Sequence, residues 1–124
     1  MDINNSKIRI PLQISKGVII VPIRYEVTHF ILETLKSDLL DFVSENKADA
    51  VIFDLKGVEI LDAEDFKGLN KIIKMIKLMG LNTVLCGLSP GIVASIVSLD
   101  VDLRQVKTTL DLNAAMDLLA NKTN

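Results

Sequence analysis

Two short and almost wholly apolar runs restrict the possible folds of this chain more than any other feature. Residues 50–55 (AVIFDL) and 82–87 (NTVLCG) are each long enough for one strand and include a single charged residue, Asp54. Strands that are apolar on both faces are typical of parallel sheets covered by helices. Residues 62–79 between them carry apolar side chains at helical spacing, and Gly80 follows as a helix-ending residue. The apolar side chains of this predicted helix are Phe66, Leu69, Ile72, Ile73, Ile76 and Met79.

The N-terminal apolar stretch predicts an antiparallel hairpin at the edge of the same sheet. Apolar residues alternate with other residues over 8–14, which is typical of a strand that buries one face. Pro11 favours an edge strand because proline cannot donate a backbone hydrogen bond. Gly17 lies in the short turn before a second apolar run, residues 17–23, and marks the hairpin turn. The alternating apolar residues are Ile8, Ile10, Leu12 and Ile14.

Three further helices and a short strand complete the expected architecture. Thr28 is expected to cap a helix over residues 28–46, Ser89 and Pro90 to begin another, and Asp111 to cap the last one. A short strand is expected near residues 105–107. The order predicts an α/β fold with one mixed sheet and about four helices. The inner faces are expected to hold Ile31, Leu35, Leu39 and Phe42 in the first of these helices, Ile92, Val93, Ile96 and Val97 in the second, and Leu112, Ala115, Met116 and Leu119 in the last.

The length and composition favour one globular domain. A chain of 124 residues predicts a single domain over 1–124, with a loose N-terminus over 1–7. Hydrophobic residues make up 49% of the chain, which excludes a disordered protein. No charge-free stretch of about 18 residues predicts a membrane span, and the first twenty residues lack the apolar core of a signal peptide. We therefore expect a cytoplasmic protein, and a mean hydropathy of +0.38 predicts that it self-associates.

Residues that could carry catalysis or hold a cofactor are scarce. The chain has one histidine, His29, near a helix start, and one cysteine, Cys86, inside an apolar strand, so we expect no metal site and no Cys–His pair. A net charge of −2 and a pI near 5.3 argue against nucleic-acid binding. The turn at residues 87–91 (GLSPG) leads into a helix N-terminus and leaves a small phosphate- or nucleotide-binding module as an alternative. Otherwise we expect no enzyme activity and no cofactor.

Acidic residues gather where the run 50–55 ends and the next helix begins. Asp54 at a strand end is typical of phosphorylated receiver domains, but the acidic pair that would hold Mg²⁺ is missing at the ends of the first strands. The simpler interpretation is that Asp62 caps the helix while Glu64 and Asp65 complement its dipole. A lysine stripe on the same helix is either a solvated face or a docking surface for an acidic partner. The stripe comprises Lys67, Lys71, Lys74 and Lys77.

Residues 50–72 (AVIFDLKGVEILDAEDFKGLNKI) resemble STAS domains, the anti-sigma-factor-antagonist family. In that family a strand ending in Asp-Leu leads through a short loop to Asp-Ser at a helix start. Residues 77–103 resemble the stressosome subset of the family, and residues 10–23 and 108–119 resemble its stand-alone scaffold members. The resemblance extends from about residue 8 to residue 119. It implies a mixed sheet with helices packed on it, and a non-catalytic protein that binds partner proteins.

The resemblance also implies a phosphorylation switch and a set of partners. The family's main phosphoacceptor position is Ala63 here, either natural or substituted, and alanine has no hydroxyl to modify. A second acceptor position of RsbR-type relatives falls on Ser95, and helical spacing places this residue away from the inner face. The alternative is that Ser95 is an ordinary solvated serine. The implied partners are RsbR-type paralogues and an RsbT-type serine/threonine kinase. The expected docking residues are Asp62, Ala63, Glu64, Asp65 and Lys67.

Three functions remain open on these grounds. The first is a stressosome-like scaffold that holds the kinase together with its paralogues. The second is a simple anti-sigma-factor antagonist that binds an anti-sigma kinase directly. The third is the nucleotide- or phosphate-binding module at residues 87–91.

Overall fold

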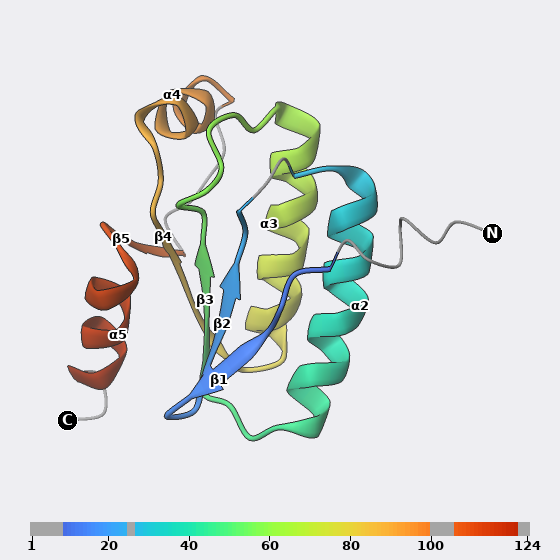
Figure 1. Ribbon diagram of the computed structural model, residues 1–124, viewed down its shortest axis with the longest axis vertical. Coiled ribbons are helices and arrows are strands. Elements are labelled where there is room, and N and C mark those ends of the chain that lie inside the picture. The colour runs from blue at the N-terminus through green and yellow to red at the C-terminus, as the bar shows by residue number, and fades with distance from the viewer. Residues whose placement is uncertain (1–8, 25–26, 100–105, 122–124) are drawn as a thin grey trace.

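The computed structural model describes residues 9–24, 27–99 and 106–121, and Figure 1 shows their arrangement. Within these ranges, five strands form one sheet and four helices pack on it. In chain order the elements are β1 (Gln13–Ser15), β2 (Val18–Pro22), α2 (His29–Glu45), β3 (Ala50–Asp54), α3 (Ala63–Leu78), β4 (Asn82–Cys86), α4 (Pro90–Ser98), β5 (Lys107–Thr109) and α5 (Leu112–Asn121).

The sheet has the strand order β1-β2-β3-β4-β5. β1 is antiparallel to β2, and every later pair is parallel. The predicted mixed sheet with an N-terminal hairpin at its edge is therefore confirmed. The hairpin turns at Lys16 and Gly17, whose φ angles are 54° and 78°, and a glycine adopts such a positive φ without strain.

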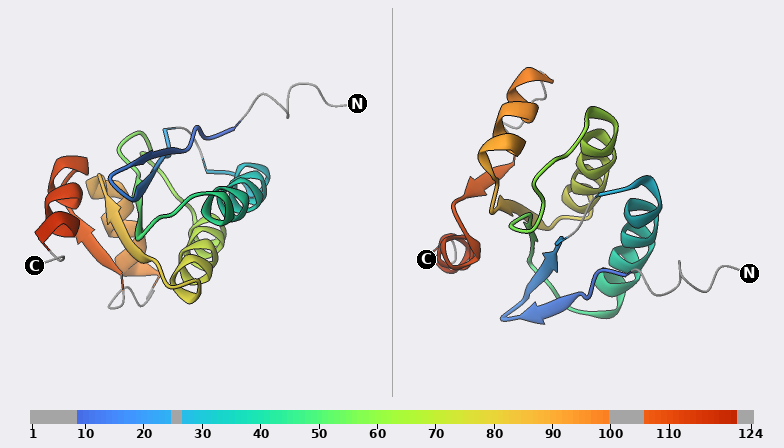
Figure 2. Two further views of the ribbon diagram at one scale, coloured as in Figure 1. Left: turned by 90° about the horizontal axis from the view of Figure 1, so that it is seen from below. Right: turned by 45° about the horizontal axis from the view of Figure 1, so that its top comes forward.

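Alternation of side chains along the strands divides the core into two layers. Ile19, Phe53 and Leu85 face the larger layer, which α2, α3 and the inner side of α4 cover. Ile52 and Val84 face the opposite side, where α5 packs. Figure 2 shows α5 alone on one side of the sheet and α2 and α3 side by side on the other. The two central strands are covered on both faces, which explains why their sequences are apolar throughout.

Helix boundaries follow the capping residues expected from the sequence. The side chain of Thr28 accepts a hydrogen bond from the backbone N–H of Ile31, and that of Ser89 accepts one from the N–H of Ile92. Asp111 caps α5 in the same way. Gly80 follows α3 with a φ of 92°, as expected for a glycine at a helix end.

Three predicted positions of apolar side chains on the helices are wrong. Val93 and Val97 were expected on the inner face of α4 but are 44% and 75% exposed, because this nine-residue helix lies at the end of the sheet and buries only the stripe of Ile92 and Ile96. Met79 is 43% exposed because it follows the last residue of α3.

The first strand is also shorter than the alternation over residues 8–14 predicts, because it lies at the sheet edge. Ile14 is 39% exposed, whereas Ile10 and Leu12 do pack against the larger core layer, and Ile8 lies outside the described residues. The last strand is displaced from its expected position near residues 105–107 to Lys107–Thr109, and residue 105 lies outside the described residues as well.

Candidate functional site

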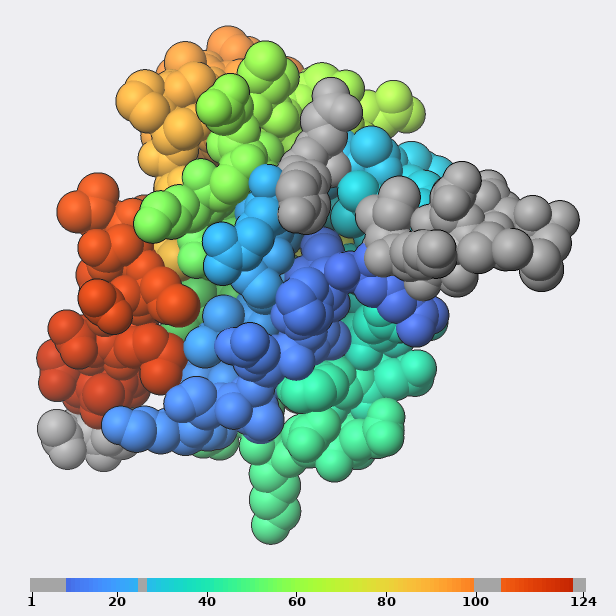
Figure 3. Space-filling view, viewed as in Figure 1, coloured from blue at the N-terminus to red at the C-terminus, as the bar shows by residue number. Residues whose placement is uncertain are grey.

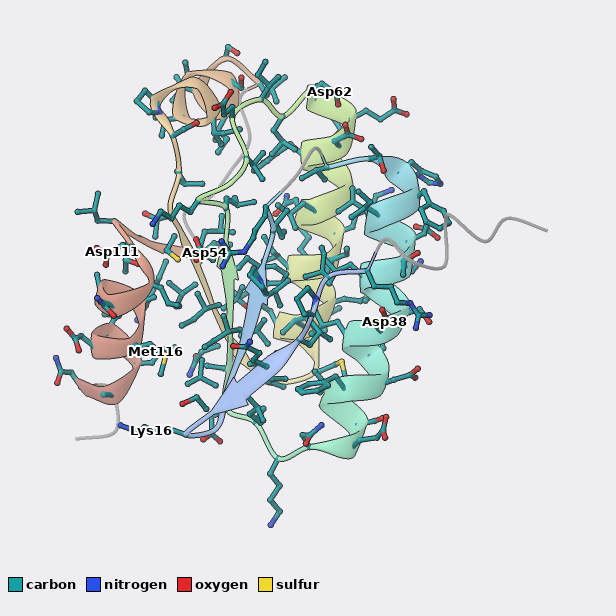
Figure 4. All side chains as sticks on the ribbon, in the orientation of Figure 1. Lys16, Asp38, Asp54, Asp62, Asp111 and Met116 are labelled. Carbon is teal, nitrogen blue, oxygen red and sulfur yellow. The ribbon has the colours of Figure 1, made fainter. Side chains whose placement is uncertain are left out.

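The loops at the carboxyl ends of the parallel strands form the candidate partner-binding edge of the molecule. Both α3 and α4 begin there, each after a loop that follows a buried strand. Figure 4 shows Asp62 at the start of α3 at this edge, with Asp54 lower down at the end of β3. In an open sheet the carboxyl ends of parallel strands are the usual location of binding sites.

The start of α3 brings together the five docking residues expected from the sequence. The Oδ1 atom of Asp62 accepts a hydrogen bond of 2.8 Å from the backbone N–H of Asp65, so Asp62 is the N-cap and Ala63 the first helical residue. Asp62, Glu64 and Lys67 are exposed, while Ala63 and Asp65 are half-buried. Three carboxylates within four residues give the helix start a dense negative charge, which the positive end of the helix dipole stabilises.

Sequence reasoning missed an apolar residue beside this acidic cluster. Ile60 precedes the cap by two residues and is 77% exposed. A large aliphatic side chain in a charged loop was the available signal. The exposed isoleucine next to the carboxylates gives the edge both an apolar and a charged contact, which is a common combination in protein interfaces.

The loop that precedes α3 is held against the rest of the edge by close backbone contacts. A Cβ added to Gly57 would lie 2.5 Å from the Cα of Arg24, and one added to Gly91 would lie 3.2 Å from the carbonyl oxygen of Glu59. Asp54 Oδ1 accepts a hydrogen bond of 3.1 Å from the backbone N–H of Lys56. The expected docking residues at the start of α3 therefore follow a loop that is packed between its neighbours.

The turn at residues 87–91 is also built from close contacts. Gly87 has a φ of 72°, and a Cβ there would lie 2.8 Å from both Asp54 Oδ1 and the backbone nitrogen of Lys56. The hydroxyl of Ser89 is used for the helix cap. A carboxylate oxygen this near the turn repels an anion, so the geometry does not favour the phosphate-binding alternative.

Ser95, the possible second phosphoacceptor, is half-buried on α4 and so is less exposed than helical spacing predicts. Its carbonyl oxygen accepts hydrogen bonds from the Ser98 hydroxyl and from the backbone N–H of Leu99, both 3.0 Å long. It follows Gly91 by four residues, and positions four apart share a flank of a helix. Ser95 thus lies on the flank of α4 that turns toward the loop before α3.

His29 and Cys86 occupy the positions expected for them. His29 is exposed at the start of α2, and Cys86 is wholly buried at the end of β4. Burial raises the pKa of the Cys86 thiol to about 12, and the carboxylates of Asp54 and Asp111 add to the shift. A thiol with this pKa stays protonated at neutral pH and is a poor nucleophile. No group of three or more His, Cys, Asp or Glu side chains suited to a metal ion occurs among the described residues.

The stability of the protein should therefore fall above pH 9. In the unfolded chain the Cys86 thiol ionises near its ordinary pKa of 9.0, whereas the raised pKa keeps it protonated in the folded protein, so unfolding releases a proton in this range. We expect the wild type to lose about 1 kcal/mol more than Cys86→Val between pH 8 and pH 10, measured by urea denaturation. Parallel pH dependences of the two proteins would contradict this assignment.

A groove lies on the α5 side of the sheet, at the end of the strands opposite the candidate partner-binding edge. This groove of about 520 Å³ runs between the β1–β2 hairpin and α5, with Lys16 and Met116 among its lining residues. Figure 3 shows the hairpin on the front of the molecule between α5 and α2, and Figure 4 shows Lys16 on the hairpin below Met116 on α5.

Of the helices in the described ranges, none is both long and apolar enough to cross a membrane.

The fold and the candidate partner-binding edge define a small α/β domain that presents the charged start of α3 to solvent. A family model described as the STAS domain matches residues 9–115. The chain belongs to the STAS family. This confirms the resemblance found in residues 50–72.

Two groups of relatives refine this assignment. The chain is 32% identical over 111 residues to the RsbT co-antagonist protein RsbRD of Bacillus subtilis (strain 168), which is 90% of this chain but 39% of that protein. A variant of RsbS from Moorella thermoacetica has a TM-score of 0.82 at 25% identity, covering 93% of this chain and all of that one. A chain from the stressosome, described as a signal integration and transduction hub, has a TM-score of 0.79 at 23% identity, covering 92% and 99%. The chain therefore spans about two fifths of the curated relative RsbRD.

Proposed function

We propose that this chain is a non-catalytic scaffold of a stressosome-like assembly and an anti-sigma-factor antagonist. It assembles with RsbR-type STAS paralogues and sequesters an RsbT-type serine/threonine kinase in the cytoplasm. The likeness to a protein named RsbT co-antagonist, over 90% of this chain, is the observation that carries the proposal. The likeness to RsbS over the full length of that chain supports a role for the STAS domain itself.

The docking surface in this proposal is the start of α3. Asp62, Ala63, Glu64, Asp65 and Lys67 lie on a loop and first helical turn that close packing holds in place. A surface that is already ordered loses little conformational entropy when a partner binds. The exposed Ile60 beside the carboxylates supplies apolar area to the same contact.

Purified chain mixed with an RsbR-type co-antagonist and an RsbT-type kinase tests the proposal. We expect large particles that contain all three proteins, measured by sedimentation velocity and mass photometry. A small complex of this chain with a kinase alone would instead identify a simple anti-sigma-factor antagonist. Strictly monomeric chain in every mixture, up to high concentration, would contradict the scaffold.

The switch is proposed to be disabled at Ala63, which has no hydroxyl. Incubated with the kinase and ATP, the wild type should take no phosphate at position 63, and any phosphate should be on Ser95. Ala63→Ser should become a strong acceptor whose modification weakens partner binding, because a phosphate adds about −1.5 to −2 charges beside Asp62, Glu64 and Asp65.

Phosphopeptide mapping and partner pull-down read out this switch. The matched control is Ala94→Ser, which adds a hydroxyl to an exposed position of α4 and should not be labelled. An Ala63→Ser protein that binds the kinase but is never labelled would refute the assignment of position 63. Phosphate on Ser89 or Ser98 and none on Ser95 would refute the second site.

A further inference from the structure

The two helices on the outer side of the larger core layer carry opposite charges. α2 (His29–Glu45) has four carboxylates and one lysine. α3 (Ala63–Leu78) has four lysines, and both of its carboxylates lie in the first turn. The two helices lie side by side and run in the same direction, as Figure 1 and Figure 2 show. The layer thus consists of an acidic helix and a basic helix, and Asp38, Asp41 and Glu45 lie on the flank of α2 that borders residues 9–12.

Three lysines form a continuous stripe along α3. Lys67, Lys71 and Lys74 are all exposed, and in the part of the chain that the structure describes none of them pairs with a carboxylate. Their spacing of four and three residues places like charges next to each other, which destabilises an isolated helix. Leu78 continues the stripe and is 88% exposed. If this face only contacted solvent, alternating charges and a polar residue in place of Leu78 would make the helix more stable.

The acidic half has unpaired charge of its own. Glu33 pairs with Lys36 at 3.6 Å, and Asp38 pairs with Arg9 at 3.6 Å. Asp41 and Glu45 are exposed and, within the described ranges, have no such partner. The carboxylates that remain free are therefore those in the second half of α2.

We infer that the α2–α3 layer is an interface between two copies of this domain. A two-fold axis parallel to the helices places α2 of one copy opposite α3 of the other, and the same contact then occurs twice. The lysine stripe meets the carboxylates of the partner's α2 in both contacts, and the exposed Leu78 adds apolar area. This inference rests on the proposed scaffold function and assigns a surface to its assembly.

Charge complementarity favours a second copy over an anionic polymer or membrane. The chain has a net charge of −2. The acidic α2 beside the stripe repels an extended polyanion, whereas it is the matching half in a two-fold pair. Lys67 belongs to both surfaces, whereas the other proposed docking residues at the start of α3 lie at the end of this layer and stay open to other partners.

Charge-swap variants of the full chain test the interface. Lys71→Glu/Lys74→Glu makes both helices acidic, and Asp41→Lys/Glu45→Lys makes both basic. We expect each variant alone to dimerise at least about tenfold more weakly than wild type in sedimentation equilibrium, because like charges then face each other. An equimolar mixture of the two should restore the dimer, since both contacts become complementary. The wild-type dimer should weaken as NaCl rises from 0.05 to 0.5 M, by screening.

Lys16→Glu is the matched control, because this exposed lysine lies on the β1–β2 hairpin outside the layer, and it should dimerise like wild type. Circular dichroism checks that all variants are folded. The inference would be overturned if the variants dimerise as tightly as wild type, or if the mixture fails to restore the dimer. The proposed scaffold function would then stand, with assembly through another surface. Wild-type protein that never self-associates would overturn it too. If that protein also stays out of particles with its paralogue, the scaffold function fails as well.

Discussion

Replacing Phe66 with alanine is expected to lower the free energy of unfolding by about 3–5 kcal/mol, which is the usual range for a fully buried phenylalanine. Phe66 has no exposed surface and belongs to the larger core layer. Its backbone N–H donates to the carbonyl oxygen of Asp62 at 2.9 Å, so the residue lies in the first turn of α3. The cavity would lie beneath the proposed docking residues, and partner binding should fall together with stability.

Urea denaturation followed by circular dichroism measures the change. Leu110→Ala is the control, because this leucine lies outside α2 and α3, its side chain is 85% exposed, and its truncation should change stability by less than about 0.5 kcal/mol. A loss below about 1 kcal/mol for Phe66→Ala would mean that α3 does not pack on the sheet as described.

Replacing Gly57 with alanine should destabilise the protein by about 2–3 kcal/mol, at the upper end of the range for overpacking. The added Cβ would lie 2.5 Å from the Cα of Arg24 and 2.6 Å from its carbonyl oxygen. Both are backbone atoms, so relief requires the loop before α3 to move away from the loop after β2. That movement displaces Ile60 and Asp62, and partner binding should weaken more than the loss of stability alone explains.

Gly68→Ala provides the matched control for this substitution. A Cβ at Gly68 would lie 2.8 Å from Cδ1 of Leu32, the far end of a flexible side chain. Alanine is also preferred over glycine inside a helix by about 1 kcal/mol, which offsets the contact. Equal losses for the two variants in urea denaturation would show that the Gly57–Arg24 contact has no special role.

The sequence by itself determined the order of the elements and most of their ends. Thr28, Asp62, Ser89 and Asp111 were all predicted as caps, and each one accepts a hydrogen bond from a backbone N–H three residues later. Such bonds depend only on neighbouring residues, so the local pattern is sufficient. The mixed sheet also followed from the sequence, because central strands covered on both faces must be apolar throughout.

The place of the proposed docking residues at one helix start was predictable from the sequence, but their surroundings were not. Asp62, Ala63, Glu64, Asp65 and Lys67 are consecutive or nearly so, and one helix start brings them together without help from the rest of the chain. Their exposure and the packing of the loop before them depend on which other segments lie beside them.

The burial of α4 was predicted incorrectly from the sequence. Helical spacing placed Val93 and Val97 inside, because periodicity identifies the apolar face of a helix but does not show how much of that face the rest of the protein covers.

Only the tertiary structure decided which residues from distant parts of the chain touch at the candidate partner-binding edge. Gly57 meets Arg24, and Asp54 lies beside both Gly87 and Cys86, across separations of about thirty residues. The opposite charges of α2 and α3 likewise become one surface only because the sheet places the two helices side by side. These contacts depend on the order and register of the strands, which backbone hydrogen bonds establish. Every residue except proline supplies the same backbone donor and acceptor, so the local sequence does not reveal which strands pair.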